Sequence, residues 1–361
     1  ASDTAEHRRM AEDRERTVRW RHWGPYLAER AWGTVREDYS AAGHAWENFP
    51  HDHARSRAYR WSEDGLAGVC DRHQLLCAAL ALWNERDPIL KERLFGLAGP
   101  QGNHGEDVKE VYYYEDATPT SSYLRYVYKY PQARYPYEAL IEENARRSGA
   151  EREFELEDLG LFREGRYFDV VVEYAKRSPS DLVMVVTARN RGPDAAPLHV
   201  LPHAWFRNTW TWEGADEHQP DLAALPDDHC AGDRRPETRF VGARATHPSL
   251  GDFFWYVEGE AELLFTHNET NTARLFGHDP RTPWVKDAFH RRVVDGDTAA
   301  VNPARHGTKA AAWLRFDVPA GGLAQVRVRL SPEPQANPFD GADALVRERF
   351  AEADEFYRAV Q

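Results

Sequence analysis

The chain has 361 residues, of which 42% are hydrophobic and 29% are charged, and its formal net charge at pH 7 is -13. This composition is typical of a folded globular protein with one large domain or two ordinary ones, and it excludes a disordered chain. Because nucleic-acid binders need a positive surface and anionic membranes repel an acidic one, we expect neither nucleic acid nor membrane as a partner.

The cysteines and the first residues bear on the cellular compartment. Cys70, Cys77 and Cys230 are odd in number and lack the spacing of a disulfide scaffold or a zinc ribbon, which favours a reducing compartment. Residues 1–21 are charged, unlike a signal peptide or membrane anchor, and no run is long and apolar enough to span a membrane. We therefore expect a cytoplasmic protein.

Three helices are predicted before residue 100. Residues 5–19 carry acids and arginines at helical spacings, typical of a solvated helix. Residues 71–84 place leucines and Trp83 on one apolar face, where Cys77 would be buried. Residues 89–97 repeat an amphipathic pattern and end at a glycine-proline turn.

The pattern changes to serial strands farther along the chain, without helices between them. The predicted strands are 111–115, 167–174, 181–190, 197–206, 253–258, 262–266, 309–318 and 323–330. This order favours an antiparallel sandwich. Residues 340–361 form a last amphipathic helix without a stop signal.

The predicted fold class is therefore mainly β: a large antiparallel β-sandwich of the supersandwich kind, with N-terminal helical segments and a C-terminal helix. We divide the chain into a helical, aromatic-rich region at 1–150 that packs on the sandwich, the sandwich itself at 151–338, and the start of a linker helix at 339–361.

Two segments near the N-terminus, 32–40 and 49–65, combine acids, arginines and aromatic rings with almost no aliphatic residues. A core segment would show an apolar stripe instead. Rings can stack on the apolar face of a sugar, while acids and arginines bind its hydroxyl groups. The candidate substrate-binding or cleft-lining residues here are Trp32, Arg36, Glu37, Asp38, Tyr39, Arg60, Trp61 and Asp64.

Adjacent acids occur three times, at 37–38, 63–64 and 106–107. A glycosidase needs two carboxyl groups, which inverting enzymes hold about 6.5–9.5 Å apart. The alternative is that these acids pair with nearby arginines and Lys109 to hold loops together. Structural or substrate-orienting roles are favoured, because polar networks outnumber catalytic pairs. His104, Glu106 and Asp107 are further cleft candidates on this basis.

Metal and cofactor sites have weak sequence support. His51, His53 and His104 are histidines beside acids, but the acid that a cupin-type site places shortly after its second histidine is missing. Neither a glycine-rich phosphate loop nor a G-x-S-x-G nucleophile motif occurs. We expect no metal and no cofactor.

A tryptophan-rich run at 205–212 provides a different candidate. Strand alternation predicts Trp210 and Trp212 on one side of a strand, as a stacking platform for a sugar or as a plug between domains.

The segments 29–40, 49–74, 80–97, 102–110, 203–212 and 265–277 resemble the N-terminal portion of bacterial glucosidases of glycoside hydrolase family 63, relatives of the processing mannosyl-oligosaccharide glucosidase. The resemblance implies a sandwich domain followed by a linker helix and an (α/α)6 barrel that carries the catalytic acid and base. That barrel would lie outside this chain, so the resemblance assigns no catalytic residue here.

The sequence thus leads to three hypotheses. The first is a non-catalytic N-terminal domain of an inverting α-glucosidase-like hydrolase, which braces its own C-terminal catalytic domain and lines a cleft for an oligosaccharide or small glucoside. The second is a free-standing carbohydrate-binding module that uses the platform at 205–212. The third is a self-contained glycosidase that uses carboxylates of 37–64 and 106–107.

Overall fold

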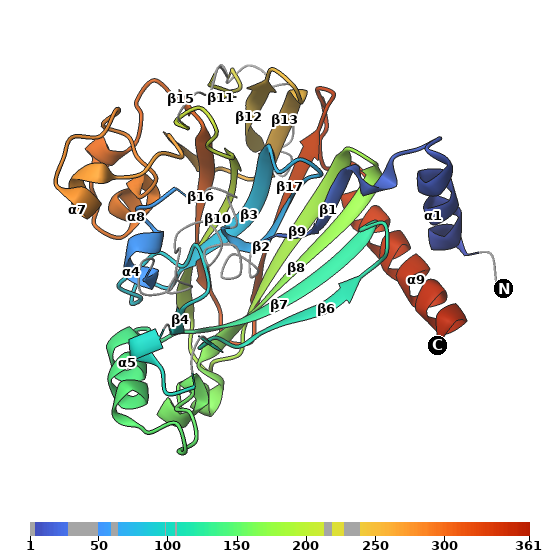
Figure 1. Ribbon diagram of the computed structural model, residues 1–361. Helices are drawn as coiled ribbons and strands as arrows, with labels where there is room; N and C mark the ends of the chain where they lie inside the picture. The colour runs from blue at the N-terminus through green and yellow to red at the C-terminus, as the bar shows by residue number, and fades with distance from the viewer. Residues whose placement is uncertain are drawn as a thin grey trace.

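The computed structural model describes residues 4–27, 50–58, 64–97, 99–104, 107–212, 219–226 and 239–361. These residues form two packed antiparallel sheets with helices on their outer faces (Figure 1). The predicted fold class, a mainly β sandwich with an N-terminal helical segment and a C-terminal helix, is confirmed.

The first sheet has six strands. In spatial order they are β1 (Trp23–Tyr26), β2 (Leu66–Asp71), β3 (Leu76–Trp83), β10 (Ala196–Phe206), β16 (Lys309–Val318) and β14 (Glu262–Thr266). All neighbouring strands in it pair in antiparallel orientation.

The second sheet has nine strands. Their spatial order is β15 (His306–Gly307), β11 (Asp221–Ala224), β12 (Phe240–His247), β13 (Gly251–Glu258), β17 (Leu323–Ser331), β9 (Asp181–Asn190), β8 (Tyr167–Ser178), β7 (Tyr123–Pro131) and β6 (Tyr112–Ala117). A separate short pair joins β4 (Gly96–Leu97) to β5 (Asp107–Val108).

One apolar core lies between the two large sheets. Leu80, Val200 and Ala312 of the six-stranded sheet pack with Val172 and Val186 of the nine-stranded sheet, and all are buried. Alternate residues of each strand enter this core, as the two-residue period of a strand requires.

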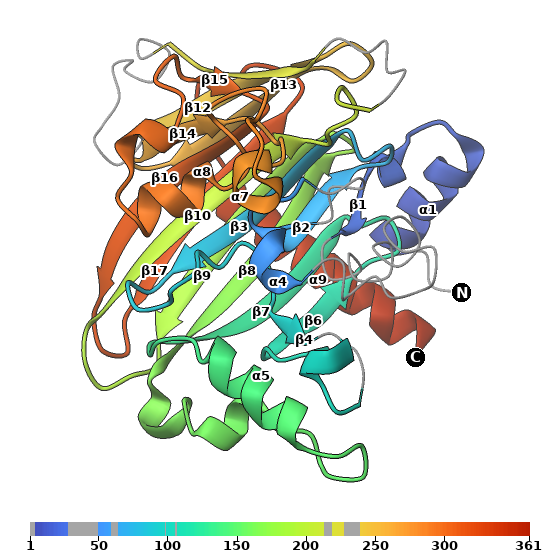
Figure 2. The same cartoon turned by 60° about the vertical axis from the view of Figure 1, so that its left-hand side comes forward.

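Helices cover both outer faces. α9 (Ala342–Val360) packs Leu345, Val346 and Ala353 on Val183 and Val185 of the nine-stranded sheet. α1 (Ala5–Glu15) lies beside α9 (Figure 1). The short helices α4 (His51–Ala54), α7 (Thr272–Phe276) and α8 (Ala288–Val293) lie in front of the six-stranded sheet (Figure 2).

Among the described residues, the remaining helices are α5 (Tyr137–Arg146) and five short 3-10 turns: η1 (Trp20–His22), η3 (Gly99–Gln101), η4 (Leu156–Leu159), η5 (Arg163–Gly165) and η7 (Thr298–Ala300). In the part of the chain that the structure describes, no helix has the length and hydropathy that a membrane crossing requires.

Two predicted helices are wrong. Residues 76–83 form β3, of which every residue but Trp83 is buried. A run buried on both faces has no polar side, so its spacing does not separate a strand from a buried helix. Residues 89–97 are not helical either, because Lys91 exchanges two backbone hydrogen bonds with Leu82 of β3, at 3.0 and 2.9 Å.

The sheets cross the boundary predicted at residue 150. β1, β2 and β3 belong to the six-stranded sheet, and β6 and β7 belong to the nine-stranded sheet. The region 1–150 is therefore built into the sandwich by backbone pairing, which its long buried strands require because an unpaired buried backbone is costly.

The packing of β3 can be tested by truncating Leu80, which is 1% exposed and lies in the inter-sheet core. We expect Leu80→Ala to lower the free energy of unfolding by about 2–5 kcal/mol, measured by urea denaturation. The control is Gln325→Ala on the exposed side of β17, which should change it by less than about 0.5 kcal/mol. Equal effects of the two substitutions would contradict the packing.

Candidate functional site

The predicted site residues divide into two groups. Trp32, Arg36, Glu37, Asp38, Tyr39, Arg60, Trp61 and Glu106 lie outside the described residues. Asp64, His104, Asp107, Trp210 and Trp212 are described, and the structure places them in two different environments.

Asp64 lies over the outer face of the six-stranded sheet, just before β2. Its carboxylate Oδ2 is 2.6 Å from the ammonium Nζ of Lys286, and both side chains are buried. The same ammonium donates to the carbonyl oxygens of Ala54 and Arg57, at 2.9 and 2.8 Å. Lys286 therefore joins the segment after α4 to the start of β2.

A second buried ion pair lies on the same face. The ammonium Nζ of Lys309, on β16, is 2.6 Å from Oε2 of Glu92, and each side chain is at most 5% exposed. The other carboxylate oxygen, Oε1 of Glu92, is buried and has no hydrogen-bond partner among the described residues. His203, on the neighbouring strand β10, is buried beside Trp205, with ring centroids 5.0 Å apart.

Trp210 joins this region through Glu269. Its indole Nε1 donates to Oε1 of Glu269 at 2.9 Å, and the backbone carbonyl of Glu269 accepts from the backbone N–H of Lys286 at 2.8 Å. Asp64 and Trp210 are thus linked through Lys286 and Glu269. We call the set Asp64, Glu92, His203, Glu269, Lys286 and Lys309 the outer-face site; the ring of Trp210 belongs to the inter-sheet core cluster and its Nε1 contacts this site.

The predicted alternation of Trp210 and Trp212 along a strand is wrong. β10 ends at Phe206, and Asn208 then forms a turn in which its Oδ1 accepts from the backbone N–H and hydroxyl of Thr211, at 3.2 and 2.7 Å. Trp210 is buried, whereas Trp212 is half-buried under the Arg207 guanidinium, whose Cζ is 5.6 Å from the ring centroid. A local side-chain hydrogen bond has replaced the strand.

Helix α4 is fastened over the same face by polar contacts. The Ser56 hydroxyl donates to Oδ2 of Asp287 at 2.6 Å, and the Asn271 amide donates to the same oxygen at 2.9 Å. The Arg274 guanidinium is 2.7 Å from Oδ2 of Asp52. Segments near residues 55, 271 and 287 therefore form one connected layer.

Burial sets the protonation of this site. It lowers the pKa of the Lys286 ammonium to about 8, although the Asp64 carboxylate acts in the opposite direction. Burial, aided by the Lys309 ammonium, lowers the pKa of His203 to about 3. The His203 ring is therefore neutral at pH 7, and the positive charges of the site reside on its two lysines.

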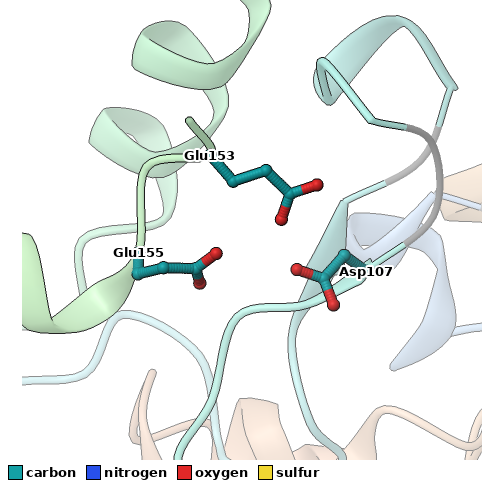
Figure 3. A group of neighbouring side chains, drawn as sticks. All are labelled: Asp107, Glu153 and Glu155. Carbon is teal, nitrogen blue, oxygen red and sulfur yellow. The ribbon is translucent and has the colours of Figure 1, made fainter. Parts of the chain in front are cut away.

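His104 and Asp107 contact a different part of the chain, residues 148–155. The His104 Nε2 is 2.8 Å from the carbonyl oxygen of Glu151. Asp107, Glu153 and Glu155 point their carboxylates toward one another, with one oxygen of each lying within 4.8 Å of the others (Figure 3). Such spacing resembles that of a cation site with oxygen ligands.

A lysine already binds these three carboxylates. The buried ammonium Nζ of Lys109 lies 2.7 Å from Asp107, 2.7 Å from Glu153 and 2.8 Å from Glu155. Burial by itself lowers the pKa of this ammonium, but the three hydrogen bonds outweigh burial and raise it. The group is therefore a clasp between residues 107 and 155, in which one buried ammonium binds three carboxylates.

Sequence reasoning missed Glu92, His203 and Lys309, whereas Glu269 and Lys286 lie in two polar loops, 265–271 and 284–287, that the sequence suggests for the same cleft. A compositional signal was present: the chain has only six lysines, and five of them are buried. All other Lys/Arg positions of the chain are arginines. Because the lysine ammonium is more compact than the arginine guanidinium, a lysine in such a chain indicates a position where a compact cation is required.

A much longer protein is similar in sequence to nearly the whole of this chain. The chain is 41% identical over 387 residues to an uncharacterized protein of Saccharomyces cerevisiae, YMR196W, in an alignment that covers 98% of this chain and 36% of that protein. The chain thus spans about a third of the length of this curated relative. No family model matches the sequence, so the resemblance to glycoside hydrolase family 63 stays a prediction.

Among solved structures, a galactose mutarotase-like protein from Lactobacillus casei aligns with 76% of this chain and 95% of its own, at 9% identity and a TM-score of 0.33. The family GH92 inverting mannosidase BT2199 from Bacteroides thetaiotaomicron aligns with 76% of this chain and 32% of its own, at 14% identity and a TM-score of 0.27. At these scores neither bears on the activity of this chain.

The buried Lys286 ammonium predicts how stability depends on pH. Its folded pKa of about 8 lies below its ordinary value of 10.5, so between these values the unfolded chain binds more protons than the folded one. The free energy of unfolding should therefore rise with pH in this window. We expect the wild type to gain stability from about pH 8 to about pH 10 relative to the double variant Asp64→Asn/Lys286→Met, measured by urea denaturation.

The double variant removes both charges together, so no unpaired buried charge remains. Lys176, whose pKa burial lowers to about 7, is present in both proteins and cancels in the difference. A stability difference that does not change with pH would contradict the assignment.

The Lys109 clasp predicts the response to divalent cations. Calcium or a chelator should leave the thermal midpoint Tm of the wild type unchanged, because the ammonium occupies the three carboxylates. Lys109→Met should lower Tm through carboxylate repulsion, and millimolar calcium should restore part of the loss. The control is Lys129→Met, since Lys129 is only partly buried beside Asp169. A calcium-dependent rise in the wild-type Tm would contradict the clasp.

Proposed function

We propose that this chain is a non-catalytic β-sandwich domain of a longer protein that acts on an oligosaccharide or a small glucoside. In this proposal, the loops above the outer-face site form one wall of the sugar cleft and brace a catalytic domain of the same polypeptide. The proposal is supported by the length of the yeast relative, of which this chain matches 36%.

The pairing of the carboxylates carries the proposal. Asp64 pairs with Lys286, Glu92 pairs with Lys309, and Glu269 accepts from Trp210. Hydrolysis of a glycoside needs one carboxyl group that gives a proton and a second that activates water or attacks. Carboxylates held by buried cations are suited to a rigid framework instead, because protonating either partner acid would leave a buried ammonium uncompensated.

We propose that the sugar is bound at the edge of this framework. Trp212 is half-buried and has an apolar ring face, and Arg207 beside it carries hydrogen-bond donors. Asn208 fixes the turn that presents both. We propose that Trp32, Arg36, Arg60 and Trp61 extend the same wall, as the sequence predicts.

The cleft wall can be tested by substituting its ring. Trp212→Ala should weaken binding of a glucose disaccharide such as maltose or kojibiose by about tenfold, equivalent to ~1.4 kcal/mol, because a stacking surface is lost. Isothermal titration calorimetry on the chain measures this. The control is Tyr113→Ala, which removes an aromatic ring that is 51% exposed on β6. Equal affinity of both variants and the wild type would contradict the placement of the sugar.

The same samples distinguish the other two hypotheses. The chain by itself should not hydrolyse a p-nitrophenyl α-glucoside. Hydrolysis that the double variant Asp64→Asn/Lys286→Met abolishes, while far-UV circular dichroism shows that the chain is folded, would establish a self-contained glycosidase. Binding of the disaccharide by a monodisperse chain, joined in nature to no catalytic domain, would establish a carbohydrate-binding module.

A further inference from the structure

Cys70 and Cys77 lie directly opposite each other in the six-stranded sheet. β2 and β3 pair in antiparallel register, with Val69 opposite Ala78 and Cys70 opposite Cys77. Both cysteines are buried free thiols. In a helix, residues seven positions apart are separated by about two turns, whereas the strand pairing makes the two cysteines immediate neighbours.

The turn between the two strands fixes this register. The Asp71 carboxylate accepts from the backbone N–H groups of His73, Leu75 and Leu76, at 2.8, 2.7 and 2.7 Å. A slip of one residue would break these hydrogen bonds and would also turn the side chains of β3 to the wrong face. The two thiols are therefore held opposite each other by the turn as well as by the sheet.

The spacing of such a pair fits a disulfide. Directly opposite residues on antiparallel strands have Cα atoms about 4.5 or 5.5 Å apart, depending on whether they are hydrogen-bonded. Disulfides usually join Cα atoms about 4.4–6.8 Å apart. Either kind of pairing brings Cys70 and Cys77 within this range without movement of the strands.

The surroundings are apolar. Leu27, Ala79 and Trp205 pack against the two cysteines on the outer face of the sheet. Burial, and contact with Cys70, raise the pKa of the Cys77 thiol well above its ordinary value. Cys70 is 7% exposed, whereas Cys77 is fully buried, so an oxidant from solvent reaches Cys70 first.

We propose that Cys70 and Cys77 are a redox modification site, which a hydroperoxide converts reversibly into a disulfide between β2 and β3. The Cys70 thiol loses its proton and its sulfur attacks the peroxide, so that the O–O bond breaks and a sulfenic acid forms. With hydrogen peroxide, the displaced hydroxide takes up the Cys70 proton and leaves as water. The Cys77 sulfur then attacks the Cys70 sulfur, the S–O bond breaks, and a second water leaves with the Cys77 proton. Two thiols are oxidised and one peroxide is reduced to two waters.

The disulfide would join two strands of the sheet that supports the outer-face site. Asp64 lies just before β2, and Trp205 contacts both the cysteine cluster and the His203 ring. A cross-link at this point limits separation of β2 from β3 and reduces the freedom of the unfolded chain. Oxidation should therefore raise Tm, on the order of a few degrees, and reduction should reverse the change.

The experiment uses the chain with Cys230→Ser, which leaves only the two cysteines in question. The protein is treated with hydrogen peroxide and alkylated under denaturing conditions, and its intact mass is then measured by mass spectrometry. We expect the number of alkylated thiols to fall from two to none, with a loss of two hydrogens and no dimer. Dithiothreitol should restore both thiols.

The single variants Cys70→Ser and Cys77→Ser, in the same background, are matched controls that should show no peroxide-dependent rise in Tm. Far-UV circular dichroism checks that they fold. Retention of both thiols in the peroxide-treated parent, addition of oxygen atoms without loss of two hydrogens, or a dimer linked through these residues would each overturn the proposal.

Discussion

The structure depends on buried ammonium groups. Five of the six lysines are at most 2% exposed: Lys91, Lys109, Lys176, Lys286 and Lys309. A buried charge is stable only when its partners replace the water that it loses. The lysine ammonium is a compact charge with three donors, so three oxygens arranged around one point satisfy it. The side-chain nitrogen of Lys109 donates to three carboxylates and that of Lys176 to three backbone carbonyl oxygens. The side-chain nitrogen of Lys286 contacts one carboxylate and donates to two carbonyl oxygens.

These ammonium groups join segments that the sheets do not. Lys176, on β8, holds carbonyls of Trp20 and Thr120, which fastens the N-terminal segment to the nine-stranded sheet. Lys91 is bound by Glu110 at 2.6 Å and by the Tyr137 hydroxyl at 2.9 Å, which fastens α5. Removing one member of a buried ion pair destabilises a protein more than replacing both members by apolar groups. At each of these lysines, a paired substitution should therefore lower the free energy of unfolding less than a single one. The loops over the outer-face site are held in the same way.

The candidate site was partly accessible to sequence reasoning. Asp64 was selected because acids and rings in a segment without an apolar stripe are unusual, and Trp210 because it lies in a tryptophan-rich run. The structure joins them through Lys286 and Glu269, a connection that has no sequence signature. Asp107 was selected as one of two adjacent acids, yet its carboxylate belongs to the Lys109 clasp, which was the structural alternative for that acid. The sequence shows Lys109 two residues away, but not that Glu153 and Glu155, which are 44 and 46 residues from Lys109, bind the same ammonium, because the fold brings them there.

The sequence by itself determined the sandwich, since strands bounded by turn signals can be recognised locally. β9, β14 and β16 have the predicted bounds, and Gly321, with a φ of 66°, turns the chain between β16 and β17. Only the tertiary structure decided that residues 76–83 are a strand, because burial on both faces removes the periodicity that distinguishes it from a helix. It also decided the ion pairs of the site: Lys309 and Glu92 are 217 residues apart, and a pairing over that distance is set by which strands become neighbours, a property of the whole fold.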